Sequence, residues 1–236
     1  MNYIRYSESN RTALVAGTAP EAIADALLSQ RACEPFDGGG MGRGVLLRFP
    51  VDHGFGVIRR FRRGGFIRHF IRESYLLHNR PLDEFEVQLY LKEQGLPVAE
   101  PLGVLWERRG LLFRGAIATR MVDALNMIVF LKSTPPDPWM PLLKSGALIR
   151  SMHDLGVYHA DLNASNLLIG QDQVYLIDFD KAARRKRVPD GLRRRNLLRL
   201  RRSMAKHGVA NAHFRTLCQG YGGAEPPAWL ARLGGR

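Results

Sequence analysis

Polar residues with fixed spacing surround a short apolar hairpin in the second half of the chain. Asp161 is followed after five residues by Asn166, and after twelve more by Asp178. Between Asn166 and Asp178 lie two apolar runs, Leu167–Ile169 and Val174–Ile177, which predict two paired strands. Because a hairpin returns the chain to its start, we expect Asn166 and Asp178 to converge. Ordinary loop residues do not require this linked spacing, so the pattern indicates a functional site.

The same residues resemble the catalytic loop and the metal-binding motif of protein-kinase-like enzymes. The stretch from His159 to Asn166 matches H-x-D-L-x-x-x-N, and Asp178 begins a D-F-x motif. Phosphoryl transfer needs a carboxylate that accepts the proton of the attacking hydroxyl, and oxygen ligands for Mg²⁺ at the nucleotide phosphates. The resemblance therefore implies ATP as donor, Asp161 as catalytic base, and Asn166 and Asp178 as magnesium ligands. His159 is expected to brace the loop by hydrogen bonds.

A glycine-rich run in the first half supplies a weaker candidate for nucleotide binding. Gly40, Gly42 and Gly44 precede a predicted strand at 45–49, where kinases place a loop over the phosphates. A flexible hairpin tip would explain the glycines equally well, because the run lacks clean G-x-G-x-x-G spacing.

Arg59 stands at the end of the next predicted strand, in the place of the kinase lysine that pairs with the nucleotide phosphates. Glu84, on the helix that follows, is the candidate ion-pair partner of Arg59. Arg60 and Glu86 remain alternatives, because a small error in register would exchange them for Arg59 and Glu84. An arginine is a departure from the kinase pattern, since its planar fork does not duplicate a lysine.

The hydrophobic pattern predicts an α+β, two-lobed, protein-kinase-like fold. The N-lobe is expected to be an antiparallel sheet with one helix, and the C-lobe to be mostly helical. We expect residues 1–35 to form an N-terminal extension, 36–122 the N-lobe and 123–236 the C-lobe. Predicted strands cover 45–49, 57–61, 97–105 and 111–122, with a turn at 107–110; predicted helices cover 20–31, 81–94 and 141–155, and the chain beyond Lys181 reads as helical.

The net charge of +13 is concentrated in two basic blocks. Residues 59–72 contain six arginines and no acid, and residues 184–202 contain ten basic side chains against Asp190 alone. A helix expected over 191–207 would turn Leu197, Leu200 and Met204 inward and leave its arginines without internal partners. These arginines include Arg194, Arg195, Arg199 and Arg202. Such local charge favours an anionic partner, and we expect both blocks to contact an anionic membrane surface.

Several departures argue against a peptide substrate. Asn163 stands where serine/threonine kinases usually have lysine, Ser165 does not supply the arginine of tyrosine kinases, and Asp180 replaces the glycine of D-F-G. The chain has no A-P-E motif, and only 56 residues follow Asp180. A small-molecule acceptor is therefore favoured.

The wider pattern is similar to the lipopolysaccharide kinase family, especially the 3-deoxy-D-manno-octulosonic acid (Kdo) kinases of Gram-negative bacteria. The similar stretches are 42–44, 57–65, 80–85, 95–101 and 153–163, within residues 36–205. The resemblance implies ATP-dependent phosphorylation of the 4-hydroxyl of a Kdo sugar on a Kdo–lipid A acceptor. It also implies a peripheral protein at the cytoplasmic face of the inner membrane. Within this resemblance the arginine at position 59 is no longer a departure. The sequence itself contains no apolar stretch of membrane-spanning length and no signal-peptide pattern.

Two other classes remain open at this point. An aminoglycoside- or choline-kinase-type phosphotransferase shares the loop pattern, although such enzymes bind cationic acceptors and this chain is basic around its candidate site. A nucleic-acid-binding pseudokinase would explain the arginines without catalysis. Aromatic residues do not interleave the 184–202 block, so we expect no specific nucleic acid, and no obligate protein partner is evident.

Overall fold

The fold is described from a computed structural model, which covers residues 2–37, 46–61, 79–109, 112–133 and 136–234. The chain divides into two compact units. The first comprises Met1–Leu89 and Glu100–Met121, and the second comprises Tyr90–Ala99 and Val122–Arg236.

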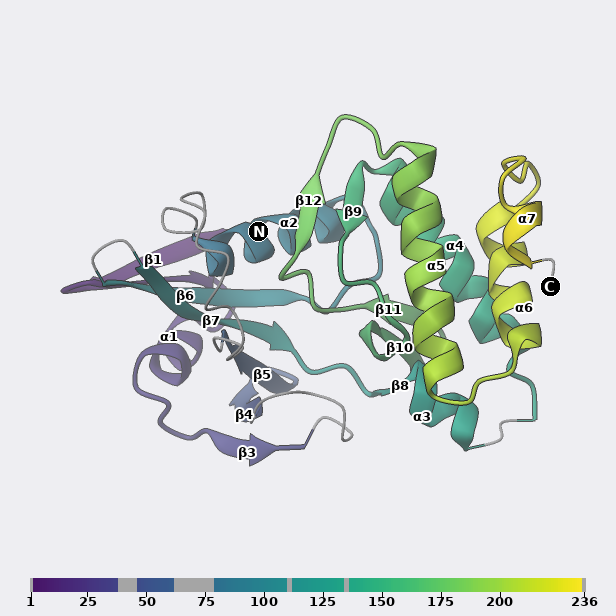
Figure 1. The fold of residues 1–236 in the computed structure, drawn as a ribbon. Coiled ribbons are helices and arrows are strands. Elements are labelled where there is room, and N and C mark those ends of the chain that lie inside the picture. The colour runs from purple at the N-terminus through teal and green to yellow at the C-terminus, as the bar shows by residue number, and fades with distance from the viewer. Residues whose placement is uncertain (1, 38–45, 62–78, 110–111, 134–135, 235–236) are drawn as a thin grey trace. The chain divides into compact units, whose positions relative to one another are not determined.

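The first unit is built on a seven-stranded antiparallel sheet (Figure 1). The strands are β1 (Tyr3–Glu8), β2 (Arg11–Ala16), β3 (Glu34–Phe36), β4 (Leu46–Val51), β5 (Gly54–Arg60), β6 (Pro101–Arg109) and β7 (Leu112–Arg120). Their spatial order in the sheet is β1-β2-β6-β7-β5-β4-β3.

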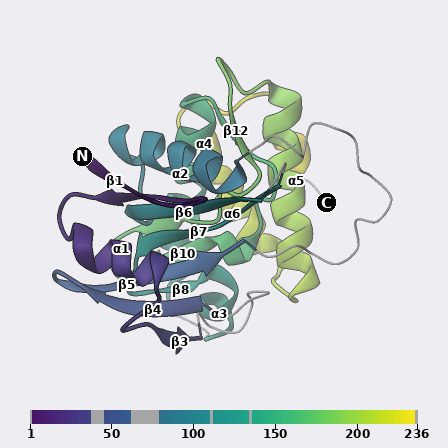
Figure 2. The ribbon, with the colours of Figure 1, turned by 90° about the vertical axis from the view of Figure 1, so that its left-hand side faces the viewer.

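Both faces of this sheet bury apolar side chains, because successive residues of a strand point to opposite faces. On one face, Ala13 and Val15 of β2 pack with Ile23 and Leu27 of helix α1 (Pro20–Leu28). On the other face, Val104 of β6 and Ile117 of β7 pack with Phe85 of helix α2 (Arg80–Glu93). Figure 2 shows α1 and α2 on the two sides of the strands. The sheet is thus a rigid frame for the side chains that it carries.

The N-terminal residues differ from the extension that we expected over 1–35. Strands β1 and β2 and helix α1 belong to the first unit, and β2 pairs with β6 from Arg11↔Glu107 to Val15↔Gly103. The sequence signal for β1 is weak because this edge strand is mostly exposed, so it lacks a clear apolar alternation. Helix α1, in contrast, begins at the proline that we expected to start it.

The predicted β-hairpin and helices of the first half are present with small shifts. Strands β4 and β5 pair antiparallel, with Leu47 opposite Ile58. The turn expected at 107–110 is wrong at its start, because β6 and β7 continue to pair as far as Arg109↔Leu112. The sequence pattern placed the turn at the charged residues 107–109. In the structure these residues belong to β6, and their backbone polar groups are satisfied by pairing with β7.

The second unit consists mainly of helices with two small sheets. The chain beyond Lys181, which we expected to be helical, first forms a short strand, Ala182–Arg184, which pairs with Val157–His159 before the helices begin. Strands β8 (Ala124–Asn126), β10 (Leu167–Gly170) and β11 (Val174–Leu176) form one sheet, and β9 (Val157–His159) and β12 (Ala182–Arg184) form the other. The helices are α3 (Met127–Lys132), α4 (Trp139–Asp154), the 3₁₀-helix η2 (Ala164–Asn166), α5 (Asp190–Lys206), α6 (Asn211–Gly222) and α7 (Ala231–Gly234).

Helices α4 and α6 approach each other closely at two glycines. A Cβ atom on Gly146 of α4 would lie 2.0 Å from the carbonyl oxygen of Leu217, and one on Gly220 of α6 would lie 2.0 Å from that of Leu143. No larger residue fits at either position without moving a backbone. The two glycines therefore fix the separation of the two helices.

Within the part of the chain that the structure describes, no helix has both the length and the apolar character that crossing a bilayer requires.

Candidate active site

The catalytic loop of the second unit starts at β9 and ends in η2. The side-chain amides of Asn163 and Asn166 both donate to the backbone carbonyl of Asp161, at 3.0 and 3.2 Å. Two donors on one carbonyl fix the backbone from which the Asp161 carboxylate projects.

Asn163 has a second structural role at the start of η2. Its side-chain oxygen accepts from the backbone N–H of Ser165 at 2.9 Å, as an N-cap does. The residue that replaces the kinase lysine thus shapes the loop and supplies no positive charge.

The hairpin β10–β11 brings the two expected metal ligands together. Leu167 pairs with Leu176, and the backbone N–H of Ile177 donates to the carbonyl of Asn166 at 3.1 Å. Asp178, the next residue, therefore lies beside Asn166, as the spacing predicted. Asp178 has a φ of 65°, in the left-handed region that is uncommon for residues other than glycine. Backbone strain of this kind is concentrated at functional sites.

The donor set of this pair fits a magnesium ion. The Nδ2 group of Asn166 is used by the Asp161 carbonyl, so its Oδ1 oxygen can face a ligand. One amide oxygen and one carboxylate are hard ligands, and Mg²⁺ takes its remaining ligands from water and nucleotide phosphates. No cluster of three or more His, Cys, Asp or Glu side chains suited to a metal occurs in the described ranges. The pair would therefore hold a metal only together with a nucleotide.

His159 is buried and braces the loop, in agreement with its expected role. Its Nε2 lies 3.3 Å from the carbonyl oxygen of Ile177 and must donate to it, because a carbonyl only accepts. Burial lowers the pKa of His159, so the ring is neutral at pH 7. Its Nδ1 atom has no partner among the described residues, as expected for the unprotonated nitrogen of this tautomer. His159 is therefore a structural residue.

The carboxylate of Asp161 forms an ion pair that the sequence did not predict. Its Oδ1 oxygen contacts Nη2 of Arg199, from the middle of α5. Ser203, one turn further along α5, accepts through its hydroxyl from the backbone N–H of Ala164 at 3.2 Å. Helix α5 therefore contacts the catalytic loop with both a charged and a neutral side chain.

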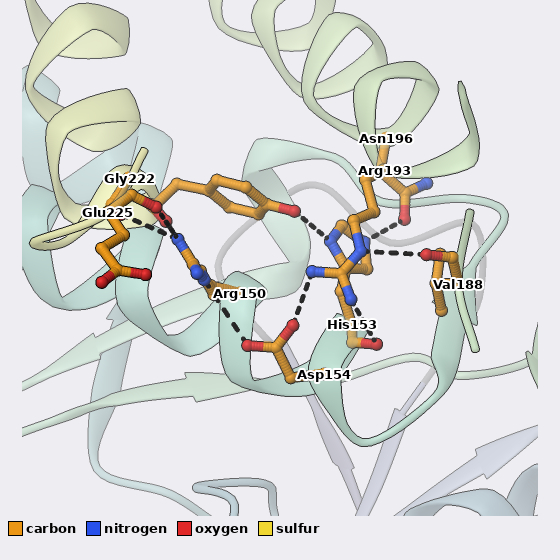
Figure 3. A network of polar contacts seen from close by, with 9 residues as sticks. Arg150, His153, Asp154, Val188, Arg193, Asn196, Gly222 and Glu225 are labelled. Atoms are coloured by element: carbon orange, nitrogen blue, oxygen red, sulfur yellow. Dashed lines mark hydrogen bonds and ion pairs between the residues drawn. The ribbon is translucent and has the colours of Figure 1, made fainter. Parts of the chain in front are cut away.

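A buried network behind the loop joins α4, α5 and α6. His153 of α4 contacts Asn196 Oδ1 through Nε2 and the Tyr221 hydroxyl through Nδ1, both at 2.9 Å (Figure 3). Asn196 Nδ2 in turn donates to the backbone carbonyl of His159 at 2.8 Å. The network links the strand before the catalytic loop to three helices.

The hydrogen positions in this network follow from its chemistry. Because Asn196 donates to the His159 carbonyl through Nδ2, its Oδ1 accepts, and His153 Nε2 must carry the hydrogen. Burial, as the largest cause, lowers the pKa of His153 to about 4, so Nδ1 accepts from the Tyr221 hydroxyl. Asn196 is a signal that sequence reasoning missed. It lies on the stripe of Leu197 and Leu200, and a polar residue on an apolar stripe indicates a buried hydrogen bond.

Ion pairs at the rim of the network join the same helices. Asp154 pairs with Arg150, one turn earlier on α4, and with Arg193 of α5 (Figure 3). Arg150 also donates to the carbonyl of Gly222 at 2.7 Å, and Arg193 to that of Val188 at 3.0 Å. These bonds hold the ends of α4, α5 and α6 in place.

In the first unit, the expected ion pair between Arg59 and Glu84 is present. Arg59 lies on β5, and Glu84 is almost fully buried on α2. The alternatives, Arg60 and Glu86, are both exposed. Gly40, Gly42 and Gly44 lie outside the described residues, as do residues 62–72 of the first basic block.

The second basic block differs from the expectation that its arginines lack internal partners. Arg193 and Arg199 form the ion pairs described above, and the Arg184 guanidinium lies 3.8 Å from the ring centre of Tyr90. Arg201 reaches the Leu233 carbonyl at 3.4 Å. Sequence pattern alone could not separate these arginines from their neighbours, because their partners are distant in sequence. Leu197, Leu200 and Met204 are buried, as predicted.

Comparison with known proteins places these observations in a family. Residues 38–221 match the model of the lipopolysaccharide kinase (Kdo/WaaP) family. A 3-deoxy-D-manno-octulosonic acid kinase of Vibrio cholerae serotype O1 is 32% identical over 175 residues, covering 72% of this chain and 73% of that protein. The kinase of the same name from Stenotrophomonas maltophilia is 35% identical over 173 residues, covering 70% and 68%.

A solved structure shows the same fold. The structure titled "WaaP in complex with acyl carrier protein" matches with a TM-score of 0.58 at 17% identity, and the match covers 90% of both chains. The α+β, protein-kinase-like fold expected from the sequence is thereby confirmed.

Proposed function

Because the chain belongs to the lipopolysaccharide kinase (Kdo/WaaP) family and is thus an ATP-dependent phosphotransferase, we propose that it phosphorylates the 4-hydroxyl of a Kdo sugar on a Kdo–lipid A acceptor. The family relation and the names of the relatives support the acceptor class. The observation that carries the chemistry is the convergence of Asp161, Asn166 and Asp178 around one loop and hairpin. The choice of the 4-hydroxyl comes from the resemblance alone.

In this proposal Asp161 takes the proton of the acceptor hydroxyl as that oxygen attacks the γ-phosphorus of ATP. The new oxygen–phosphorus bond forms, the bond to the oxygen that bridges the β- and γ-phosphorus atoms breaks, and ADP leaves. The Asn163 and Asn166 amides hold the backbone of Asp161 in place during this transfer. A base held in this way contributes typically about 10²–10⁴-fold to the rate.

Asn166 Oδ1 and the Asp178 carboxylate would hold Mg²⁺, which neutralises charge on the nucleotide phosphates. Arg59, fixed by Glu84, is the proposed phosphate-pairing cation of the first unit. Gly40, Gly42 and Gly44 remain the predicted phosphate-covering glycines.

A direct experiment tests the acceptor. The purified protein is incubated with ATP, Mg²⁺ and a Kdo–lipid A acceptor, and mass spectrometry should detect one added phosphate. Fragmentation and NMR of the product should place that phosphate on oxygen 4. Unchanged acceptor, or a phosphate on the lipid A part, would overturn the assignment.

The metal role is tested by Asp178→Asn, since asparagine tolerates the left-handed backbone and alanine would add strain. This variant should need more Mg²⁺ for half-maximal activity than the wild type, because it lacks one charged ligand. Asp161→Asn should lower the rate at every Mg²⁺ concentration without shifting the titration. Superimposable metal titrations of wild type and Asp178→Asn would exclude Asp178 as a ligand.

We also propose that the protein lies at the cytoplasmic face of the inner membrane as a peripheral protein. Three exposed arginines of α5 support this, namely Arg194, Arg195 and Arg202. Each basic side chain near an anionic leaflet contributes about 1 kcal/mol of attraction.

A protein partner also enters the proposal, although none was evident from the sequence. The WaaP structure contains an acyl carrier protein, which makes such a protein the first candidate to test here. The test is whether the protein retains acyl carrier protein during co-purification, with bovine albumin as an acidic control. Retention of acyl carrier protein alone would support the partner, and equal retention of both proteins would exclude a specific interaction.

A further inference from the structure

The ion pair between Asp161 and Arg199 places a positive charge directly on the proposed catalytic base. The side chains are 36% exposed for Asp161 and 44% exposed for Arg199, so both are accessible to solvent. The remaining N–H groups of the Arg199 guanidinium have no hydrogen-bond partner among the described residues. Arg199 can therefore bind a second anion beside the base.

The catalytic loop does not depend on Arg199 to remain against α5. Asn196 donates to the His159 carbonyl before the loop, and Ser203 accepts from Ala164 within it. Residues 196, 199 and 203 are three and four positions apart, so they share one face of α5. An exposed ion pair adds only about 0–1 kcal/mol of stability. The two neutral contacts thus hold the loop, and Arg199 is available for another role.

In the free enzyme this ion pair opposes the chemistry. The acceptor hydroxyl must donate its proton to an Asp161 oxygen, and the guanidinium on Oδ1 leaves it only Oδ2. A charge-assisted bond of this kind is stronger than a neutral one, so a hydroxyl competes poorly for the same oxygen. A group on the acceptor that draws the guanidinium away would free the base.

We propose that Arg199 is a specificity residue that binds a carboxylate of the acceptor and, by leaving Asp161, frees the base only when an acidic sugar is bound. This inference rests on the proposed function. The relatives are named as kinases of an octulosonic acid, so their acceptor carries a carboxylate on the sugar that is phosphorylated. Once the hydroxyl of that sugar lies at Asp161, its carboxylate lies close to the same side chain. A guanidinium fork matches a carboxylate in a bidentate way.

The test compares Arg199→Gln with Lys206→Gln, which removes a charge from the exposed last turn of the same helix. Each protein is assayed with a detergent-solubilised acceptor that has a free sugar carboxylate, with its methyl ester, and with an acceptor lacking the lipid phosphates. For the wild type and Lys206→Gln, esterification should lower kcat/KM on the order of 10–100-fold, the effect of losing a hydrogen bond to a charged group. Arg199→Gln should have nearly the same kcat/KM with the free acid and with the ester, because it lacks both the contact to the carboxylate and the guanidinium that occupies the base.

If Arg199→Gln still distinguishes acid from ester by the wild-type factor, the inference is wrong. A loss of kcat/KM on removal of the lipid phosphates, and not on esterification, that the wild type shows and Arg199→Gln does not would assign Arg199 to a phosphate and likewise overturn the inference. Unchanged thermal unfolding of Arg199→Gln is expected, because the ion pair is exposed.

A binding measurement separates this inference from the proposed function. The free sugar acid should bind the wild type and Lys206→Gln in calorimetry, and should bind Arg199→Gln at least about 10-fold more weakly. Such binding without phosphorylation would refute the proposed function and leave the carboxylate site standing. Equal binding to all three proteins would refute the carboxylate site.

Discussion

Each unit contains one arginine–carboxylate pair at a proposed functional position, and the two pairs differ in burial. Glu84 is 2% exposed and Arg59 31% exposed, and Phe85, next to Glu84 on α2, lies in an apolar core with Val104 and Ile117. Asp161 and Arg199 are 36% and 44% exposed, and Asp161 lies on a loop. A buried carboxylate needs its counter-charge to remain charged, whereas an exposed one can exchange it for water or a ligand. The same chemical pair is thus a fixed element in one unit and exchangeable in the other.

The largest expected effect is the loss of activity in Asp161→Ala. In the proposed function this carboxylate accepts the proton of the acceptor hydroxyl, so its removal should lower kcat by about 10²–10⁴-fold. Binding of ATP, measured by calorimetry, should remain, since the proposed partner of Asp161 is the acceptor and not the nucleotide. Wild-type-like turnover would show that the pair of Asp161 and Arg199 has no part in the chemistry. The comparison with the pair of Arg59 and Glu84 would then have no functional meaning.

Arg59→Ala should reduce the stability of the protein more than Glu84→Ala does. It leaves the buried Glu84 carboxylate without this counter-charge, and breaking a buried pair in that way costs about 3–5 kcal/mol. Glu84→Ala leaves an arginine that is partly exposed and can be hydrated. Urea unfolding without nucleotide measures both, and Arg60→Ala is the exposed control on the same strand. Equal losses for Arg59→Ala and Glu84→Ala would mean that burial does not distinguish the pairs.

The network behind the exposed pair should weaken as the pH falls. His153 has a pKa of about 4 in the folded protein and about 6.5 when unfolded, so the unfolded chain binds more protons between these values. Stability is therefore lost as the pH decreases from about 6.5 to 4, by up to about 3 kcal/mol. His153→Gln should be less stable at pH 7 but show a flatter pH dependence of its urea midpoint. His207→Gln, outside the network, should keep the wild-type slope; identical slopes for all three proteins would exclude His153 as the titrating group.

The smallest effect per residue is expected for the exposed arginines of α5. Changing Arg194, Arg195 and Arg202 to glutamine, with Arg199 intact, should lower binding to anionic liposomes by about 1 kcal/mol per residue at low salt. Turnover of a detergent-solubilised acceptor should not change, because these side chains do not contact Asp161. High salt should remove the difference in liposome sedimentation, since the charges are screened. If the variant sediments with anionic liposomes as the wild type does at low salt, Arg194, Arg195 and Arg202 have no role in membrane binding.

Much of this arrangement was predictable where the signal is local. The spacing of Asn166 and Asp178 required only one hairpin, and the stripe of Leu197, Leu200 and Met204 required only helical periodicity. Arg199 was not predictable, since its partner is 38 residues away in sequence and α5 contains five other arginines. Strand β1 was missed for the opposite reason: its exposed side chains carry no periodic signal, and pairing with β2 defines it.

The glycine contact between α4 and α6 bears on any attempt to make this enzyme more heat-resistant. An engineer who follows helix propensity would replace Gly146 by alanine and expect a gain of about 1 kcal/mol. The added methyl group would instead force the two helices apart, because it would meet the Leu217 carbonyl oxygen. Gly191, in the first turn of α5, has no atom within 4 Å of the place that a Cβ would occupy and accepts the same replacement freely. Two glycines that look alike to a consensus or propensity method thus have opposite value as engineering targets.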